Sequence, residues 1–182
     1  MILASRSPQR RAILTQLGFE FEVVVPDVEE LEDGDPREMV VENALRKVRA
    51  VEGDVVLGVD TTVVLDGRSY GKPGTEAQAR EVLELLSDRT HEVWSGIALN
   101  ERTATACTRV TFRKLSPGLL DWYLASGEWR ERAGGYAIQG RGAALVERID
   151  GDFWNVVGLP VPTLLDLLGE QGFRACTQAP NR

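Results

Sequence analysis

The chain has 182 residues, of which 43% are hydrophobic and 27% charged, a composition typical of one globular domain with a sizeable core. Its net charge of −7 argues against unspecific binding to nucleic acid, because the phosphate backbone would be repelled. No segment has the character of a signal peptide or of a membrane span, so we expect a cytoplasmic protein with no membrane partner.

Apolar residues at strand or helix spacing predict alternating elements in the first half of the chain. Strands are expected at residues 2–4, 19–25 and 55–64. Helices are expected from Ser7 to Gly18, from Asp35 to Val51 and from Thr75 to Leu86, with an acidic loop over 27–35. Ser7, Asp35 and Thr75 are suited to cap these helices. The last two are followed at capping-box spacing by Glu38 and Gln78.

The second half begins with strand patterns and ends with a helical one. Strands are expected at residues 92–99, 104–115, 143–149 and 153–157. Helices are expected from Ser116 to Gly127 and over residues 162–168. The pairs Asp66-Gly67 and Asp150-Gly151 each separate two strand patterns, which is the signal of a β-hairpin.

Hairpins beside helical crossovers predict an α/β fold with a mixed sheet. The chain contains no repeat and no linker-like composition, so a single domain is expected over residues 1–174. The last residues, 175–182, carry no pattern and are expected to form a disordered tail.

A carboxylate, Asp60, interrupts the apolar strand pattern of residues 55–64. A charge there is costly unless the protein needs it. Lys72 follows on a turn fixed by Pro73, and a carboxylate and an ammonium at one rim are suited to handling a metal and a phosphate. The alternative is that Asp60 caps a turn and that Lys72 is a solvated loop lysine.

Two further clusters suit an anion and a metal. Ser5, Ser7 and Arg10 lie around a helix N-terminus, where free N–H groups and the helix dipole attract anions, although this feature alone favours plain capping by Ser7 with surface arginines. The acidic pair Glu29-Glu30 is either a solvated loop or a holder of Mg²⁺. Lys47, within a predicted helix, is a weak signal by itself because helical lysines mostly face solvent.

Residues 133–142 contain four glycines, a density that indicates positive φ angles or close backbone approach in a loop that lines a ligand. Gln139, at its centre, can both donate and accept hydrogen bonds. His91 is the only histidine, which excludes a multi-histidine zinc centre, and we expect it to have a structural or surface role and not a catalytic one. Cys107 and Cys176 form no CxxC motif and indicate neither a zinc site nor a disulfide framework.

In this order, the clusters resemble the Maf family of nucleoside triphosphate pyrophosphatases, also called septum-formation inhibitor proteins. The resemblance extends from Leu3 to about Leu168. Its motifs are LASRSP at 3–8, Glu29-Glu30, Lys47, GVDTTVVLDG at 58–67, GKP at 71–73, LSDRTHEVWSG at 86–96, AGGYAIQGRG at 133–142 and NVVGLP at 155–160. No single motif is decisive, but the shared order and spacing make coincidence implausible.

The resemblance implies hydrolysis of a nucleoside triphosphate between its α and β phosphates, giving the nucleoside monophosphate and pyrophosphate. It implies an elongated α/β fold, similar to inosine triphosphate pyrophosphatases, with a cleft between two lobes, and commonly a homodimer. By the same resemblance Asp60 is the general base and, with Glu30, holds a divalent metal, Mg²⁺ or Mn²⁺. The positions that hold the triphosphate are Ser5, Arg10, Lys47 and Lys72.

Three positions divide this family by substrate. Thr61, after the catalytic Asp60, and Gln139 match the branch that takes dTTP and UTP. Another branch takes 7-methyl-GTP and has Gln and Glu at these positions, with Trp after the Ser-Pro. Gln9 matches neither that Trp nor the usual Arg, and a neutral side chain there predicts a site open to CTP or other nucleotides.

Two other classes of protein remain as alternatives. One is a non-catalytic nucleotide-binding protein acting in septum control, which would have no need of a placed base such as Asp60. The other is a phosphatase or kinase of unrelated mechanism, but the sequence has no P-loop, no kinase signature and no supported histidine nucleophile.

Overall fold

The computed structural model describes residues 1–177, and in this part of the chain seven strands form one mixed sheet. The strands are β1 (Ile2–Ala4), β2 (Glu22–Val24), β3 (Val56–Leu65), β4 (Arg68–Tyr70), β5 (Thr90–Leu99), β6 (Arg102–Phe112) and β7 (Val146–Asp150). Their order is β2-β1-β3-β5-β6-β7, with β4 paired to β3. β1 is parallel to both of its neighbours, and the other pairs are antiparallel. The predicted α/β fold with a mixed sheet is confirmed.

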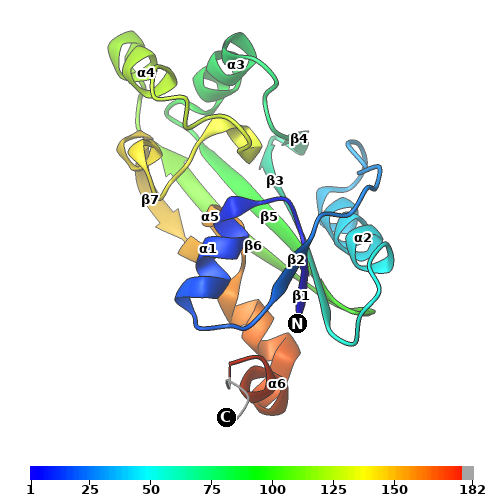
Figure 1. Cartoon of the computed structure of the whole chain (residues 1–182). Helices are drawn as coiled ribbons and strands as arrows, with labels where there is room; N and C mark the ends of the chain where they lie inside the picture. Colours follow the sequence, from blue (N-terminus) through cyan, green and yellow to red (C-terminus); the bar gives the residue numbers. More distant parts are fainter. Residues whose placement is uncertain (178–182) are drawn as a thin grey trace.

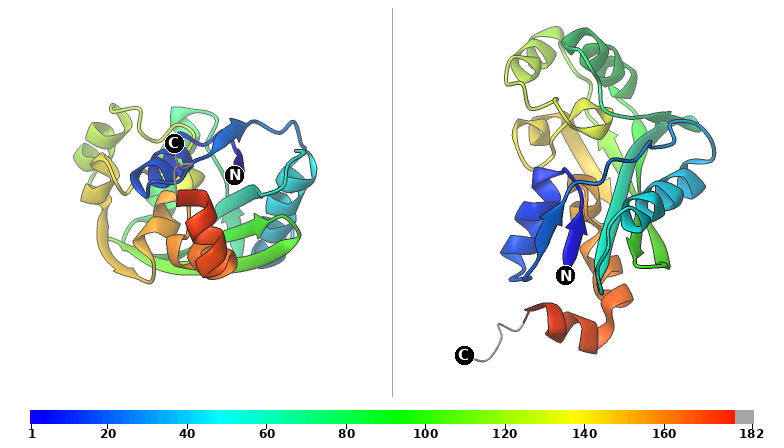
Figure 2. Two further views of the ribbon diagram at one scale, coloured as in Figure 1. Left: turned by 60° about the horizontal axis from the view of Figure 1, so that its bottom comes forward. Right: turned by 45° about the vertical axis from the view of Figure 1, so that its right-hand side comes forward.

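Helices flank this sheet along its length (Figure 1). The α-helices are α1 (Pro8–Gln16), α2 (Pro36–Arg49), α3 (Glu76–Leu86), α4 (Pro117–Leu124), α5 (Phe153–Val157) and α6 (Val161–Thr177), and the 3₁₀ helices are η1 (Ala133–Gly135) and η2 (Arg141–Leu145). Ser7, Asp35 and Thr75 cap α1, α2 and α3 as predicted. The molecule is elongated, with α3 and α4 at one end and α6 at the other (Figures 1 and 2).

Within residues 1–177 the core has three hydrophobic clusters: a small one packs α2 against β1, β3 and β5, and two larger ones divide the rest of the core along the sheet. One gathers around α3, α4 and the nearby ends of β3 and β5, and includes Val63. The other lies under α1 and α6 and includes Val59. Asp60 and Thr61 therefore lie in β3 between residues of the two larger clusters.

Two glycines let α2 lie close against the sheet. Gly58 of β3 and Gly96 of β5 have no side chain, and a Cβ at either would clash with the carbonyl oxygen of Ala44 or Val40 in α2. Gly96 lies directly opposite Asp60 in the sheet register. The close approach brings the sheet-facing side chains of α2 to the Asp60 carboxylate.

The hairpins predicted at the two Asp-Gly pairs differ in their outcome: one is confirmed and one is wrong. Asp66 and Gly67 have φ angles of 52° and 76° and join β3 to β4 in the predicted hairpin. The hairpin predicted around Asp150-Gly151 is wrong, because β7 pairs with β6 and residues 153–157 form α5. The reason is Asp152, whose side chain caps α5 by accepting a hydrogen bond of 2.9 Å from the Trp154 N–H.

The C-terminal helix α6 has two helical segments. The first ends after Leu168, as predicted, because Gly169 has non-helical angles (φ 65°, ψ 176°), and a second segment that was not predicted continues to Thr177. The first three residues of the expected tail, 175–177, are therefore helical, and Cys176 is buried and accepts a 2.8 Å hydrogen bond from the Glu20 N–H. Residues 178–182 of that tail lie outside the described residues. Among the helices of residues 1–177, none is long and apolar enough to cross a membrane.

Candidate active site

Asp60 is the centre of a buried polar cluster on β3. Asp60 is 8% exposed, and its carboxylate accepts hydrogen bonds at both oxygens. Lys47 Nζ donates to Oδ1 at 2.7 Å, and Asn43 Nδ2 donates to Oδ2 at 3.0 Å. Asn43 and Lys47 are four residues apart in α2, so both lie on the helix face that meets the sheet.

The surroundings of Asp60 keep it ionised. Burial by itself raises the pKa of the Asp60 carboxyl, but the charge of Lys47, the hydrogen bonds from Lys47 and Asn43 and the charge of Arg10 hold that pKa below its usual value. The carboxylate is therefore negative at neutral pH and available to a cation or to a water O–H.

Lys47 connects Asp60 to the acidic loop. Its ammonium lies 3.0 Å from Glu30 Oε1 and 2.7 Å from Asp60 Oδ1, and it donates to the Val59 carbonyl at 3.2 Å. Lys47 is buried, whereas the Glu30 side chain is 50% exposed. The structure thus brings together three predicted site residues, and Lys47 is one of the uncommon lysines that a helix buries.

Arg10 forms a second part of the cluster, beside the turn between β1 and α1. Its guanidinium is buried and donates to Gly158 O at 2.9 Å, Ser5 Oγ at 3.1 Å and Thr61 Oγ1 at 3.1 Å. Burial lowers the pKa of Arg10, and the charges of Asp60 and Glu30 oppose that shift. Ser5 and Arg10 are therefore more than capping residues, since together they hold a cation against β3.

Thr61 supports this cation. Its hydroxyl accepts from Arg10 and lies 2.8 Å from the hydroxyl of Ser95, the residue directly opposite in β5. Ser95 is fully buried. In this geometry the Thr61 hydroxyl holds the Arg10 guanidinium in place. A residue assigned to substrate specificity would instead be expected to contact the nucleotide base directly.

Sequence reasoning missed Asn43 and Ser95. Asn43 is a polar residue on the apolar face of α2, between Val40 and Lys47, and that irregularity was visible in the sequence. Ser95 gave no comparable signal, because its role depends on the register that places it opposite Thr61.

The other predicted residues, Lys72, Gln139 and Gln9, have hydrogen-bond partners outside this cluster or none among the described residues. Lys72 is exposed and pairs with Glu131 at 3.2 Å. Gln139 is exposed in a turn of the glycine-rich loop, and Gln9 accepts a 2.9 Å hydrogen bond from the Ser7 hydroxyl. No hydrogen bond within the described residues links these three side chains to Asp60, Lys47 or Arg10.

Hydrogen bonds to buried side chains anchor the glycine-rich loop, residues 133–142. Gly134 and Gly135 have φ angles of 66° and 71°, as the glycine density predicts. Tyr136 places its hydroxyl 2.9 Å from Nε2 of buried His91, and the Ala137 N–H donates to the Tyr123 hydroxyl at 3.0 Å. Burial lowers the pKa of His91 to about 4, so this histidine is neutral and structural.

The residues present fit a divalent metal with few protein ligands. No group of three or more His, Cys, Asp or Glu side chains converges within the described residues. Glu30 and Asp60 do converge, since both contact the same Lys47 ammonium. Mg²⁺ is commonly bound by one or two carboxylates, with phosphates and water completing its coordination.

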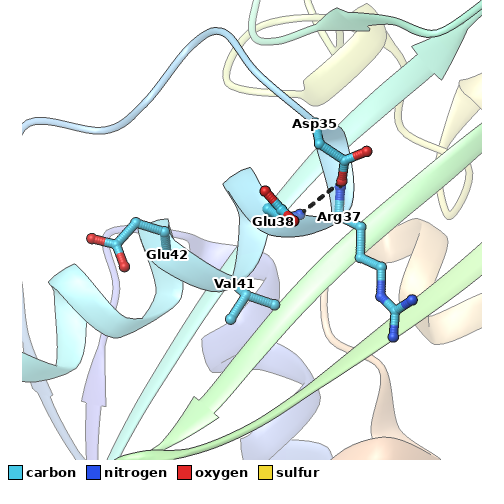
Figure 3. A pocket seen from close by; sticks show the side chains of 5 residues that line it. All are labelled: Asp35, Arg37, Glu38, Val41 and Glu42. Carbon is cyan, nitrogen blue, oxygen red and sulfur yellow. Dashed lines mark hydrogen bonds between the residues drawn. The ribbon is translucent and has the colours of Figure 1, made fainter.

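A shallow hollow beside the first turns of α2 is a poor alternative (Figure 3). It is lined by Asp35, Arg37, Glu38, Val41 and Glu42. Three carboxylates and one guanidinium give it a net negative charge, which would repel a triphosphate. We therefore place the site at the Asp60 cluster.

The chain belongs to the Maf-like protein family, which it matches over residues 1–171. A dTTP/UTP pyrophosphatase from Symbiobacterium thermophilum is 45% identical over 183 residues, covering 95% of this chain and 94% of that protein. Proteins of the same name from Gloeobacter violaceus and Dictyoglomus turgidum are 47% and 43% identical over 180 and 186 residues. These alignments cover 93% and 95% of this chain, and 95% and 96% of the relatives. The family inferred from the sequence motifs is confirmed.

Proposed function

We propose that this protein is a nucleoside triphosphate pyrophosphatase that hydrolyses dTTP and UTP to the nucleoside monophosphate and pyrophosphate. The observation that carries the proposal is the buried cluster in which Asp60, Lys47 and Arg10 place one carboxylate beside two cations. The names of the three relatives, each nearly as long as this chain, support the substrate class.

In this proposal the cations bind the triphosphate. Arg10 and Ser5 hold phosphate oxygens at the N-terminus of α1, where the helix dipole adds to the attraction. Lys47 offsets charge that builds on the departing pyrophosphate. The side chain of Lys72 is exposed and flexible. In this proposal it leaves Glu131 and reaches the same phosphates, since an exposed ion pair costs little to break.

Asp60 orients the attacking water and accepts its proton. A carboxylate with a lowered pKa is by itself a weak base, so most of its effect comes from orientation. Glu30 and Asp60 would hold Mg²⁺ or Mn²⁺. When bound, such an ion polarises phosphate oxygens and makes a coordinated water more acidic.

Base selection is assigned to three residues. Gln139 can accept from N3–H and donate to O4 of thymine or uracil, and its exposed position leaves both groups available. Thr61 acts through Arg10, by fixing where the phosphates lie. Gln9, held by the Ser7 hydroxyl, adds no charge, and we propose that CTP is accepted as a slower substrate.

Product analysis tests this function directly. Purified protein with Mg²⁺ and dTTP should release pyrophosphate and dTMP in equal amounts. Release of orthophosphate would show a phosphatase of different mechanism. Binding of dTTP without any release would show a non-catalytic nucleotide-binding protein.

Two properties of the assembled protein belong to the same proposal. We propose a homodimer, which light scattering of the purified chain tests by its mass. We also propose that the protein acts in the cytoplasm, where nucleoside triphosphates are made and used. Fractionation of cells that produce a tagged chain would test that location.

A further inference from the structure

Asn43 is a buried amide whose hydrogen-bonding groups are all used. It is 1% exposed, in the middle of α2. Its Nδ2 donates to Leu31 O at 3.0 Å and to Asp60 Oδ2 at 3.0 Å, and its Oδ1 accepts from the Leu31 N–H at 2.7 Å. Turning the amide over would put N–H against N–H and oxygen against carboxylate, so the network fixes its orientation.

These bonds join the acidic loop to the Asp60 carboxylate. Asn43 pairs with both backbone groups of Leu31 as a neighbouring strand would, although the loop has no secondary structure there. On the other side of Glu30, Arg46 donates to the Glu29 carbonyl at 2.9 Å. Glu30 is therefore held from both sides by α2, and Lys47 contacts its carboxylate from the same helix.

A purely structural anchor would need only the two bonds to Leu31. The third bond, to Asp60 Oδ2, ties the loop to the one buried carboxylate of the cluster. Asn43 thereby sets the distance between Glu30 and Asp60, the two carboxylates that the proposed function assigns to a divalent ion. Outer partners that orient such carboxylates affect how well a site binds its metal.

We propose that Asn43 is a positioning residue that holds the Glu30 loop and the Asp60 carboxylate in one arrangement for binding a divalent cation. This inference rests on the proposed function for the identity of the two carboxylates. It does not depend on which nucleotide is hydrolysed, so its test uses full-length protein without nucleotide.

The test compares Asn43→Ala with Val48→Ala, the truncation of another buried residue five positions further along α2. Two quantities are measured: the hydrogen exchange of the Leu31 amide, and the affinity for Mn²⁺ alone, by electron paramagnetic resonance. Asn43→Ala should expose the Leu31 amide to exchange and weaken Mn²⁺ binding by roughly 10-fold, the scale for losing an outer partner of a metal ligand. Val48→Ala should leave both quantities as in the wild type.

A second variant keeps the proposal testable if Asn43→Ala does not fold. Arg46→Ala removes the bond to the Glu29 carbonyl and the 3.0 Å ion pair with Glu42 from a partly exposed side chain, and it should give a smaller loss of Mn²⁺ affinity with faster exchange near Glu30. Wild-type Mn²⁺ affinity in folded Asn43→Ala would overturn the proposal, and so would wild-type affinity in Arg46→Ala if Asn43→Ala does not fold. Equal losses in Asn43→Ala and Val48→Ala would also overturn it, because they would reflect general loosening of α2. A wild type that binds Mn²⁺ but cleaves no nucleotide would contradict the proposed function and leave this inference standing.

Discussion

Acid should destabilise this protein through His91, and replacing His91 with Gln should remove that part of the acid sensitivity. His91 is 1% exposed, packs edge-on against Phe112 and Tyr136, and has its Nε2 2.9 Å from the Tyr136 hydroxyl. Its pKa falls from an ordinary 6.5 to about 4 because burial penalises the charged imidazolium.

The direction of the change in stability with pH follows from which state of the protein, folded or unfolded, binds the proton at His91. Between about pH 6.5 and 4 the unfolded chain protonates His91 and the folded chain does not, so stability is full above that window and falls with pH inside it. The complete loss is about 3 kcal/mol, and about 2 kcal/mol of it is reached by pH 5. Gln can still hydrogen-bond to the Tyr136 hydroxyl but does not titrate.

Urea unfolding at pH 7.5 and pH 5 measures this effect for the wild type and His91→Gln. Because carboxylates titrate in both proteins, the quantity of interest is the difference between their losses of unfolding free energy. The wild type should lose about 2 kcal/mol more than His91→Gln. Equal losses would refute the reasoning and show that the folded protein accommodates the imidazolium.

Three further predictions concern the site itself. Lys47→Met should lower the free energy of unfolding by about 3 kcal/mol at neutral pH, because the Asp60 carboxylate is left buried without its main partner. The loss should be smaller when Asp60 is also replaced by Asn. Ser95→Ala should lower kcat/KM for dTTP by about five-fold, the value of one hydrogen bond behind Thr61 and Arg10, whereas an unchanged value would remove Ser95 from the account. Gln139→Glu should fold normally and lower specificity constants for dTTP and UTP more than for CTP, since it loses the donor to O4. Uniform losses across these three nucleotides would make Gln139 structural.

Local signals in the sequence predicted most elements of the fold. Capping residues such as Thr75 act within one turn of their helix, and the Asp66-Gly67 turn is decided by two φ angles, so neighbouring residues contain the necessary information. The Asp150-Gly151 hairpin failed because a competing local signal, the Asp152 cap, starts a helix after the same dipeptide. The second segment of α6, after Gly169, was missed because Cys176 is held by contacts with residues far away in the chain.

In the site, as in the second segment of α6, the residues missed from the sequence are those whose role depends on distant contacts. Asp60 was found because a charge in an apolar strand pattern stands out, whereas Glu30, Lys47 and Arg10 were assigned their roles by the resemblance to the Maf family. The structure places all four in one cluster. Asn43 and Ser95 were not found, because a hydroxyl or an amide has ordinary frequency in the sequence and these two gain their roles only from helix packing and from register. Asn43 is the clearest example, since its contacts with the acidic loop and β3 arise only once α2 lies against Gly58 and Gly96.

The central claim is that Asp60 is the group on which turnover depends, and Asp60→Asn tests it most directly. Pyrophosphate release from dTTP is measured with excess Mg²⁺ for the wild type and the variant, with a thermal melt of each as the control for folding. Asn keeps the shape of the carboxylate but cannot accept the proton and binds Mg²⁺ poorly, so turnover should fall by ~10²–10⁴ while the protein stays folded. Turnover within a few-fold of the wild type would contradict the account.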